Sequence, residues 1–133
     1  MIFDIKILGY IKIFENLTKA RVKDCFTDDK ELIFIVNEGE IGKAIGKQGS
    51  TIKMVSEKFK KKIKVIEYNS KPEKFVLNLI YPLKPEVTIK DNKIIIKTSS
   101  NQEKGKIFGR GRENFKKLSN LINKYFKLIL SLE

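Results

Sequence analysis

The sequence predicts an α+β fold built from two tandem copies of one small unit. The 133 residues match themselves when they are shifted by 63 positions, and both halves show the same order of helical and strand-like segments. The formal net charge of +12 also divides equally between two lysine-rich segments, each of which contains a glycine loop. We therefore expect two domains, residues 1–69 and residues 70–133.

The repeat aligns residues of three kinds at one constant spacing: loop glycines, lysines and the apolar residues of the flanking helices. Chance would rarely align all three kinds together. The aligned pairs are Gly42/Gly105, Lys43/Lys106, Gly46/Gly109, Ile45/Phe108, Ile52/Phe115, Lys53/Lys116, Val55/Leu118, Ser56/Ser119, Phe59/Ile122, Ile63/Phe126, Lys64/Lys127 and Ile66/Ile129. Loop and core are thus repeated as a unit.

The first copy is expected to begin with a helix over Ile5 to Ala20, because its apolar residues recur at spacings of three and four. Alternation of Val22 and Asp24 against Lys23 and Cys25 predicts a strand, and a turn over residues 28–31 joins it to an apolar strand. The expected segments are strands Ala20–Phe26 and Leu32–Asn37, helix Glu40–Ile45, loop Gly46–Gly49, helix Ser50–Lys60 and strand Lys62–Tyr68.

The second copy is expected to repeat this order. Pro72 suits the first turn of its opening helix, and Asp91-Asn92 suits the turn of a hairpin. The expected segments are helix Pro72–Leu79, strands Val87–Lys90 and Lys93–Thr98, helix Gln102–Phe108, loop Gly109–Arg112, helix Asn114–Lys124 and strand Phe126–Leu130. Units this small bury little surface alone, so we expect the two copies to stabilise each other.

The composition argues against several classes of protein. Cys25 is the only cysteine and histidine is absent, which excludes an internal disulfide and a Cys/His zinc site. A thiol with no histidine to activate it is expected to be buried and structural. Carboxylates do not cluster as they do in reaction centres, so we predict neither an enzyme nor a cofactor. No apolar run reaches about 18 residues, so we expect no segment that spans a membrane. The single cysteine fits a reducing compartment, and we expect a cytoplasmic monomer without a membrane partner.

The positive charge indicates a polyanionic partner. Residues 40–66 and residues 101–127 each carry a net +6, which leaves the rest of the chain neutral. Charge that served only solubility would be scattered, whereas these clusters centre on the two glycine loops. Nucleic acid is the common partner for such a surface, and anionic lipid is the alternative.

The loop Gly46-Lys47-Gln48-Gly49 has the chemistry of a phosphate contact. Glycines let a phosphate backbone approach the main chain, and the loop leads into a helix N-terminus, where free N–H groups favour anions. Taken alone, such a GxxG sequence is equally consistent with a plain helix–helix turn capped by glycine. The adjacent lysines and the repeat favour a binding loop, and a P-loop is excluded because Gly-Lys-Ser/Thr is missing.

The GxxG loop resembles that of KH domains, which clamps about four nucleotides of single-stranded RNA. The strand order resembles the prokaryotic type II KH topology, which implies a three-stranded sheet covered on one face by three helices. The chain as a whole resembles archaeal NusA, a short form with two KH domains. The motifs that carry the resemblance are Phe14-Glu-Asn-Leu-Thr-Lys-Ala20, Val22-Lys-Asp-Cys25, Val36-Asn-Glu-Gly39, Ala44-Ile-Gly-Lys-Gln-Gly49, Lys61-Lys-Ile-Lys-Val-Ile-Glu-Tyr68, Lys104-Gly-Lys106 and Gly109-Arg110.

This resemblance implies an RNA-binding factor of transcription elongation and termination, with RNA polymerase and ribosomal proteins as candidate protein partners. The alternatives are a KH protein of ribosome assembly or RNA processing, and a polymerase-binding adaptor with weak RNA affinity. The residues expected to bind RNA are Ile41, Lys43, Ile45, Gly46, Lys47, Gln48, Gly49, Ile52 and Lys53 in the first copy, and Lys106, Gly109, Arg110, Gly111, Arg112 and Lys116 in the second.

The second loop departs from the family pattern, because the repeat places Arg112 where the last loop glycine belongs. We expect this loop to hold RNA through guanidinium groups rather than through bare backbone. The alternative is a degenerate copy that is kept for packing.

Overall fold

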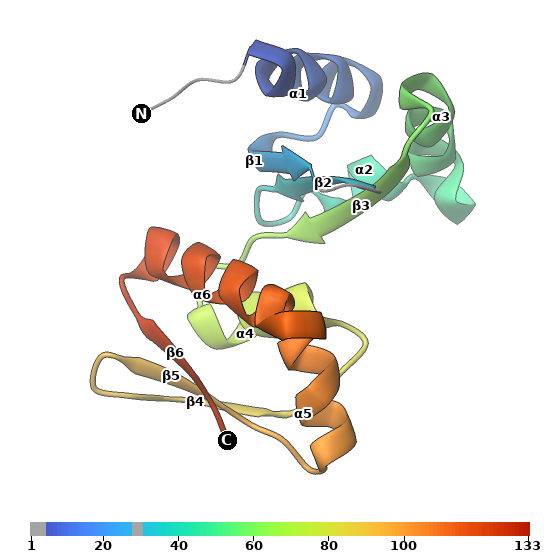
Figure 1. The fold of residues 1–133 in the computed structure, drawn as a ribbon. Coiled ribbons are helices and arrows are strands. Elements are labelled where there is room, and N and C mark those ends of the chain that lie inside the picture. Colours follow the sequence, from blue (N-terminus) through green and yellow to red (C-terminus); the bar gives the residue numbers. More distant parts are fainter. Residues whose placement is uncertain (1–4, 28–30) are drawn as a thin grey trace. The chain divides into compact units, whose positions relative to one another are not determined.

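A computed structural model describes residues 5–27 and 31–133, so residues 28–30 of the predicted turn lie outside this part of the chain, and Glu31 begins a strand. The chain divides into two compact units, Met1–Asn69 and Ser70–Glu133, which Figure 1 shows in sequence colours. The first unit contains α1 (Ile5–Thr18), β1 (Val22–Thr27), β2 (Glu31–Val36), α2 (Ile41–Ile45), a 3-10 turn η1 (Lys47–Gly49), α3 (Ser50–Phe59) and β3 (Lys62–Glu67).

The sheet of the first unit has the order β1-β2-β3, with β1 antiparallel and β3 parallel to the central strand. The parallel pair needs a crossover connection, which α2, η1 and α3 supply. Along β2, Leu32 lies opposite Ile63 and Phe34 lies opposite Val65. The glycine loop therefore lies within the connection between two neighbouring parallel strands of one sheet.

The core of the first unit lies between one face of its sheet and three helices. Alternate residues of β2 point to this face, and Phe34 stacks on Phe14 of α1 with ring centroids 4.0 Å apart. Ala44 of α2 and Val55 of α3 are fully buried in the same cluster. An α+β unit with three helices on one face of a three-stranded sheet is therefore confirmed here.

Helix α1 ends at Thr18, two residues before the predicted end at Ala20. The Thr18 hydroxyl donates to the carbonyl oxygen of Phe14 (2.8 Å) and accepts from the N–H of Ala20 (3.0 Å). Lys19 takes a left-handed conformation (φ 64°), as residues that terminate helices often do. The helix therefore stops where its side chains and backbone cap it, although Ala20 itself is buried in the core.

The predicted alternation of β1 is wrong at one position. Val22 and Asp24 were expected on one face, but the ladder with β2 shifts between these two residues. A bulge of this kind places an extra residue in one strand, so the faces exchange beyond it. Val22 and Cys25 therefore both pack against the core.

The second unit repeats the order of elements. It contains α4 (Pro72–Ile80), β4 (Glu86–Lys90), β5 (Lys93–Lys97), α5 (Asn101–Phe108), a 3-10 turn η2 (Arg110–Arg112), α6 (Glu113–Phe126) and β6 (Ile129–Leu132). The sheet order is β4-β5-β6, again with one antiparallel and one parallel pair. Figure 1 shows α4 and α6 on the same side of this sheet, and Pro72 lies in the first turn of α4 as predicted.

The end of the second unit differs from what the 63-residue repeat predicts. Helix α6 has 14 residues and α3 has 10, so α6 continues through Phe126, where a strand was expected. Both helices end at a left-handed lysine, Lys60 and Lys127, which lie 67 positions apart rather than 63. Four residues make about one helical turn, so the insertion keeps the buried face in place. The alignments of Ile63, Lys64 and Ile66 with residues 126, 127 and 129 are therefore wrong.

Candidate nucleic-acid interface

The first glycine loop is a sharp turn between α2 and α3. Helix α2 ends where Gly46 turns out of it (φ 76°, ψ 173°), a conformation essentially confined to glycine. Gln48 (φ 56°) and Gly49 (φ 75°) then take successive left-handed conformations before α3 begins. The carbonyl oxygen of Gly46 accepts the N–H of Gly49 at 3.2 Å, which closes the turn.

The second loop has the same backbone. Gly109 has φ 71° and ψ 177°, and Gly111 (φ 62°) and Arg112 (φ 63°) follow in left-handed conformations. The carbonyl oxygen of Gly109 accepts the N–H of Arg112 at 3.2 Å. Through the loop the 63-residue alignment is therefore confirmed, and Arg112 stands where the first unit has Gly49.

The first glycine of each loop is required by close packing. A Cβ on Gly46 would lie 2.8 Å from the backbone nitrogen of Thr51. A Cβ on Gly109 would lie 2.6 Å from Cγ of Asn114, the residue that aligns with Thr51. Gly49 differs, because its Cβ would meet only a methyl carbon of Ile52 at 3.8 Å. Packing therefore does not require the glycine at position 49, where the half-buried backbone is left uncovered by any side chain of its own.

The structure gathers the residues predicted for the first unit around this loop. The apolar ones are half-buried, and the Lys47, Gln48 and Lys53 side chains are exposed. The half-buried apolar residues are Ile41, Ile45 and Ile52, and Ile41 also packs against the core cluster. In the second unit, Lys106, Arg110, Gly111, Arg112 and Lys116 are exposed and Gly109 is half-buried. That these residues contact RNA stays a prediction.

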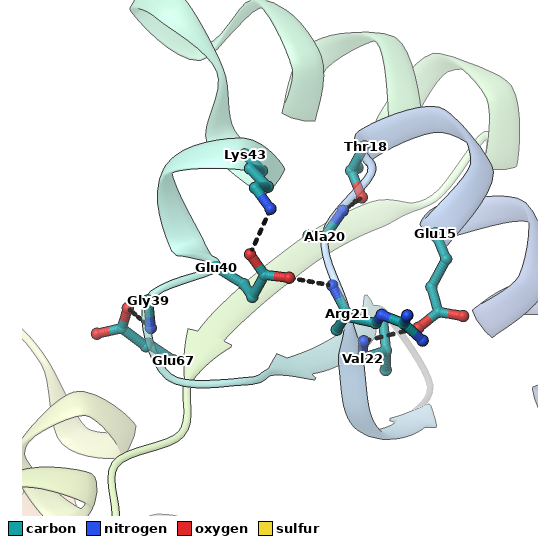
Figure 2. A network of polar contacts seen from close by, with 9 residues as sticks. All are labelled: Glu15, Thr18, Ala20, Arg21, Val22, Gly39, Glu40, Lys43 and Glu67. Carbon is teal, nitrogen blue, oxygen red and sulfur yellow. Dashed lines mark hydrogen bonds and ion pairs between the residues drawn. The ribbon is translucent and has the colours of Figure 1, made fainter.

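Lys43 has a structural partner. Its ammonium lies 2.9 Å from a carboxylate oxygen of Glu40, whose other oxygen accepts the N–H of Arg21 at 3.1 Å. Figure 2 shows this contact joining α2 to the chain that enters β1. The hydrogen bond from Lys43, followed by that from Arg21, lowers the pKa of the Glu40 carboxyl from its ordinary value of 4.5. The Lys43 ammonium is thus already paired with a carboxylate of its own unit.

Carboxylates also fasten two other turns of the first unit. Glu15 accepts the N–H of Val22 at 2.9 Å, and Glu67 accepts the N–H of Gly39 at 3.0 Å (Figure 2). In the second unit Glu103, which aligns with Glu40, accepts the N–H of Ser99 at 3.1 Å. These glutamates stabilise connections between successive elements, so their charge serves the fold.

Arg112 of the second loop forms an aromatic cluster with two phenylalanines beside the loop, Phe108 and Phe115. The guanidinium carbon of Arg112 lies 5.1 Å from the centroid of the Phe108 ring. The rings of Phe108 and Phe115 lie 5.3 Å apart at 57°. Neither phenylalanine was among the predicted site residues, although the repeat aligns them with Ile45 and Ile52, which were. That alignment was the signal that could have identified them.

Cys25 is buried, as expected of a structural thiol. Burial, with a smaller contribution from the charge of Asp24, raises its pKa to about 12. Within residues 5–27 and 31–133, His, Cys, Asp and Glu form no group of three or more that could hold a metal ion. No helix in this part of the chain is long and apolar enough to cross a bilayer.

A three-stranded sheet of this topology, with a GxxG loop between two helices, defines the KH class of RNA-binding module. The sequence profile of the KH domain matches residues 9–79. The chain is 32% identical over 123 residues to the probable transcription termination protein NusA of Methanocaldococcus jannaschii, covering 89% of this chain and 67% of that protein. For the protein of the same name from Halococcus morrhuae, identity is 31% and the coverages are 91% and 89%.

A third relative of that name, from Methanococcus vannielii, is 43% identical over 76 residues, which cover 57% of this chain and 44% of that protein. This chain thus spans less than half of that relative. The crystal structure of APE1850 matches with a TM-score of 0.72 and 32% identity, covering 98% of this chain and all of the other. The chain belongs to the KH-domain family and, within it, to the NusA proteins of archaea.

Proposed function

We propose that this protein binds single-stranded RNA through the loop Gly46–Gly49, and that its second unit is a second KH domain. The observation that carries the proposal is the open backbone at Gly49, held in place by the close packing of Gly46 on Thr51. Lys47 and Lys53 are exposed beside it, and the loop leads into the N-terminus of α3. A phosphate can therefore meet N–H groups and ammonium groups together.

We further propose that this RNA binding serves transcription, because relatives along most of the chain are named as probable transcription termination proteins. RNA polymerase is then the protein partner to test first. In this role the chain acts by binding, without catalysis. A pull-down from native cell extract, with the RNA sequenced and the proteins identified, tests the process. Recovery of ribosomal precursors without polymerase would instead support a role in ribosome assembly.

The loop is tested by changing Lys47 and Gln48 together to aspartate, which places two anions at the phosphate site without touching the core. Filter binding of a short single-stranded RNA should weaken at least about tenfold, because a charge-assisted hydrogen bond contributes roughly 1.5–3 kcal/mol. The thermal midpoint should change little, since both side chains are exposed.

A matched control makes the same charge change elsewhere. Lys90 and Asn92 are exposed at the turn between β4 and β5, which Figure 1 shows at the far end of that sheet from α5. Changing both to aspartate should reduce affinity only slightly. Equal losses in the two double variants would mean that net charge, and not the loop, holds the RNA. Absence of binding by the wild-type chain would favour the polymerase-binding adaptor.

A further inference from the structure

The two loops share a backbone but present different surfaces. Around the first loop, the positions in question hold Ile45, Gly49 and Ile52. Around the second, the same positions hold Phe108, Arg112 and Phe115, which form the aromatic cluster. The first loop is therefore aliphatic with bare backbone, whereas the second offers two aromatic rings and a planar cation.

The aromatic cluster stays partly open to solvent. Both rings are half-buried and Arg112 is exposed, while Ile107 and Leu118 supply the buried contacts of α5 and α6. Arg112 also keeps a left-handed backbone (φ 63°), which costs an L-residue roughly 1–2 kcal/mol. Glycine occupies this position in the first unit without that cost. Each loop thus has one non-glycine residue in a left-handed conformation, which is Gln48 in the first unit and Arg112 in the second.

The position at which the loop backbone carries no side chain also differs between the two units. A Cβ on Gly111 would meet nothing within 4 Å, whereas the aligned residue of the first loop, Gln48, carries a side chain. The second loop is thus open to a phosphate one residue before the position that is open in the first. Arg112 lies beside this opening, with its guanidinium carbon 5.1 Å from the centre of the Phe108 ring.

We infer that the aromatic cluster of Arg112, Phe108 and Phe115 is a platform on which one nucleobase of single-stranded RNA stacks. This inference rests on the proposed RNA binding and assigns the second loop a different kind of contact. Bases stack on aromatic rings and on guanidinium planes, whatever their sequence. The net +6 of residues 101–127 attracts the RNA strand to this platform. The second loop therefore adds a stacked base to the phosphate contact that its backbone at Gly111 allows.

The test uses the full chain and short RNAs in which 2-aminopurine replaces one base at a time. Stacking quenches 2-aminopurine fluorescence, so at least one position should be quenched on binding. The variant Phe108→Ile/Phe115→Ile installs the residues of the first unit. It should lose the quenching at that position and bind about tenfold more weakly, equivalent to roughly 1.4 kcal/mol. Arg112→Lys, which keeps the charge but removes the plane, should show a smaller loss.

An abasic nucleotide at the quenched position provides the decisive comparison. With that RNA, the wild-type chain and the isoleucine variant should bind equally, because no base remains to stack. Arg21→Lys is the matched control, since it makes the same exchange at an exposed residue outside both loops and should leave the quenching intact. A melting curve shows whether the isoleucine variant is folded.

The outcomes separate this inference from the proposed function. If the wild-type chain binds RNA and the isoleucine variant keeps its affinity and quenching, the platform is refuted while RNA binding stands. If the wild-type chain does not bind RNA, both fail. If the isoleucine variant unfolds, Arg112→Lys decides alone, and unchanged quenching in that variant overturns the platform.

Discussion

Gly49 and Arg112 occupy the same place in the two units and have nearly the same backbone, with φ 75°, ψ 14° and φ 63°, ψ 19°. Only one of them is a glycine. The left-handed conformation is therefore a property of the loop and persists without the residue that adopts it most easily. What the substitution changes is the surface: bare backbone at Gly49, and a guanidinium over the Phe108 ring at Arg112.

The two glycines of the first loop should differ sharply in tolerance to alanine. Gly46→Ala places a Cβ 2.8 Å from the Thr51 nitrogen and forces alanine into a conformation that only glycine adopts readily. The free energy of unfolding should therefore fall by about 2–5 kcal/mol. Gly49→Ala meets only a methyl group at 3.8 Å and should cost roughly 1 kcal/mol. Chemical denaturation measures both values. The pair Gly109→Ala and Gly111→Ala repeats the comparison in the second unit, and equal losses within either pair would contradict the packing argument.

RNA binding should depend steeply on salt. If each loop holds about four nucleotides, at roughly 0.7 counterions per phosphate, the log–log slope of affinity against salt should be about −3 for one loop. Engagement of both loops should bring the slope to about −5 or −6. Filter binding across a salt series gives this number. A slope near zero would show that the lysine clusters do not contact phosphate.

The contact between Glu40 and Lys43 should appear in the pH dependence of stability. The pKa of Glu40 is lowered in the folded protein, so its ionised form stabilises the fold at neutral pH. That stabilisation should be lost as the pH falls below 4.5 and through the lowered pKa. Glu40→Gln should therefore melt below the wild type at pH 7, with the difference closing in acid. Glu57→Gln, on the exposed face of α3, is the control and should show no such closing.

Cys25 should be unreactive in the native protein. Burial raises its pKa to about 12, so almost no thiolate exists at neutral pH, and the thiol itself is buried. Labelling with a thiol reagent at pH 8 should be slow and should accelerate in denaturant together with the loss of helical signal. Fast stoichiometric labelling of the folded chain would show that β1 opens locally.

Patterns set by neighbouring residues were predicted well from the sequence. The spacing of Ile7, Tyr10, Ile11, Phe14 and Leu17 predicted the buried side of α1, and all five lie in or against the core cluster. The glycines at 46 and 109 marked both loops correctly, because a turn of this kind needs a residue without a Cβ. Such signals are local, because each of these residues is constrained by others only a few positions away in the sequence.

Two of the errors share one physical origin. The bulge between Val22 and Asp24 depends on how β1 pairs with β2, and the extra turn of α6 depends on what its last residues pack against. Phe126, expected in a strand, ends α6, and its ring lies 6.0 Å from that of Phe75 in α4. Partners distant in the chain decide such features, and the hydrophobic pattern does not reveal those partners.

For the candidate site, the sequence by itself determined the two loops, their lysines and the exceptional residue at Arg112. Composition, spacing and the repeat carry that information without reference to space. Only the tertiary structure decided what surrounds each loop: that Gly46 packs on Thr51, that Lys43 pairs with Glu40, and that Arg112 stacks on Phe108. These contacts depend on side-chain directions and on the angle between two helices, which are set when the helices pack on the sheet.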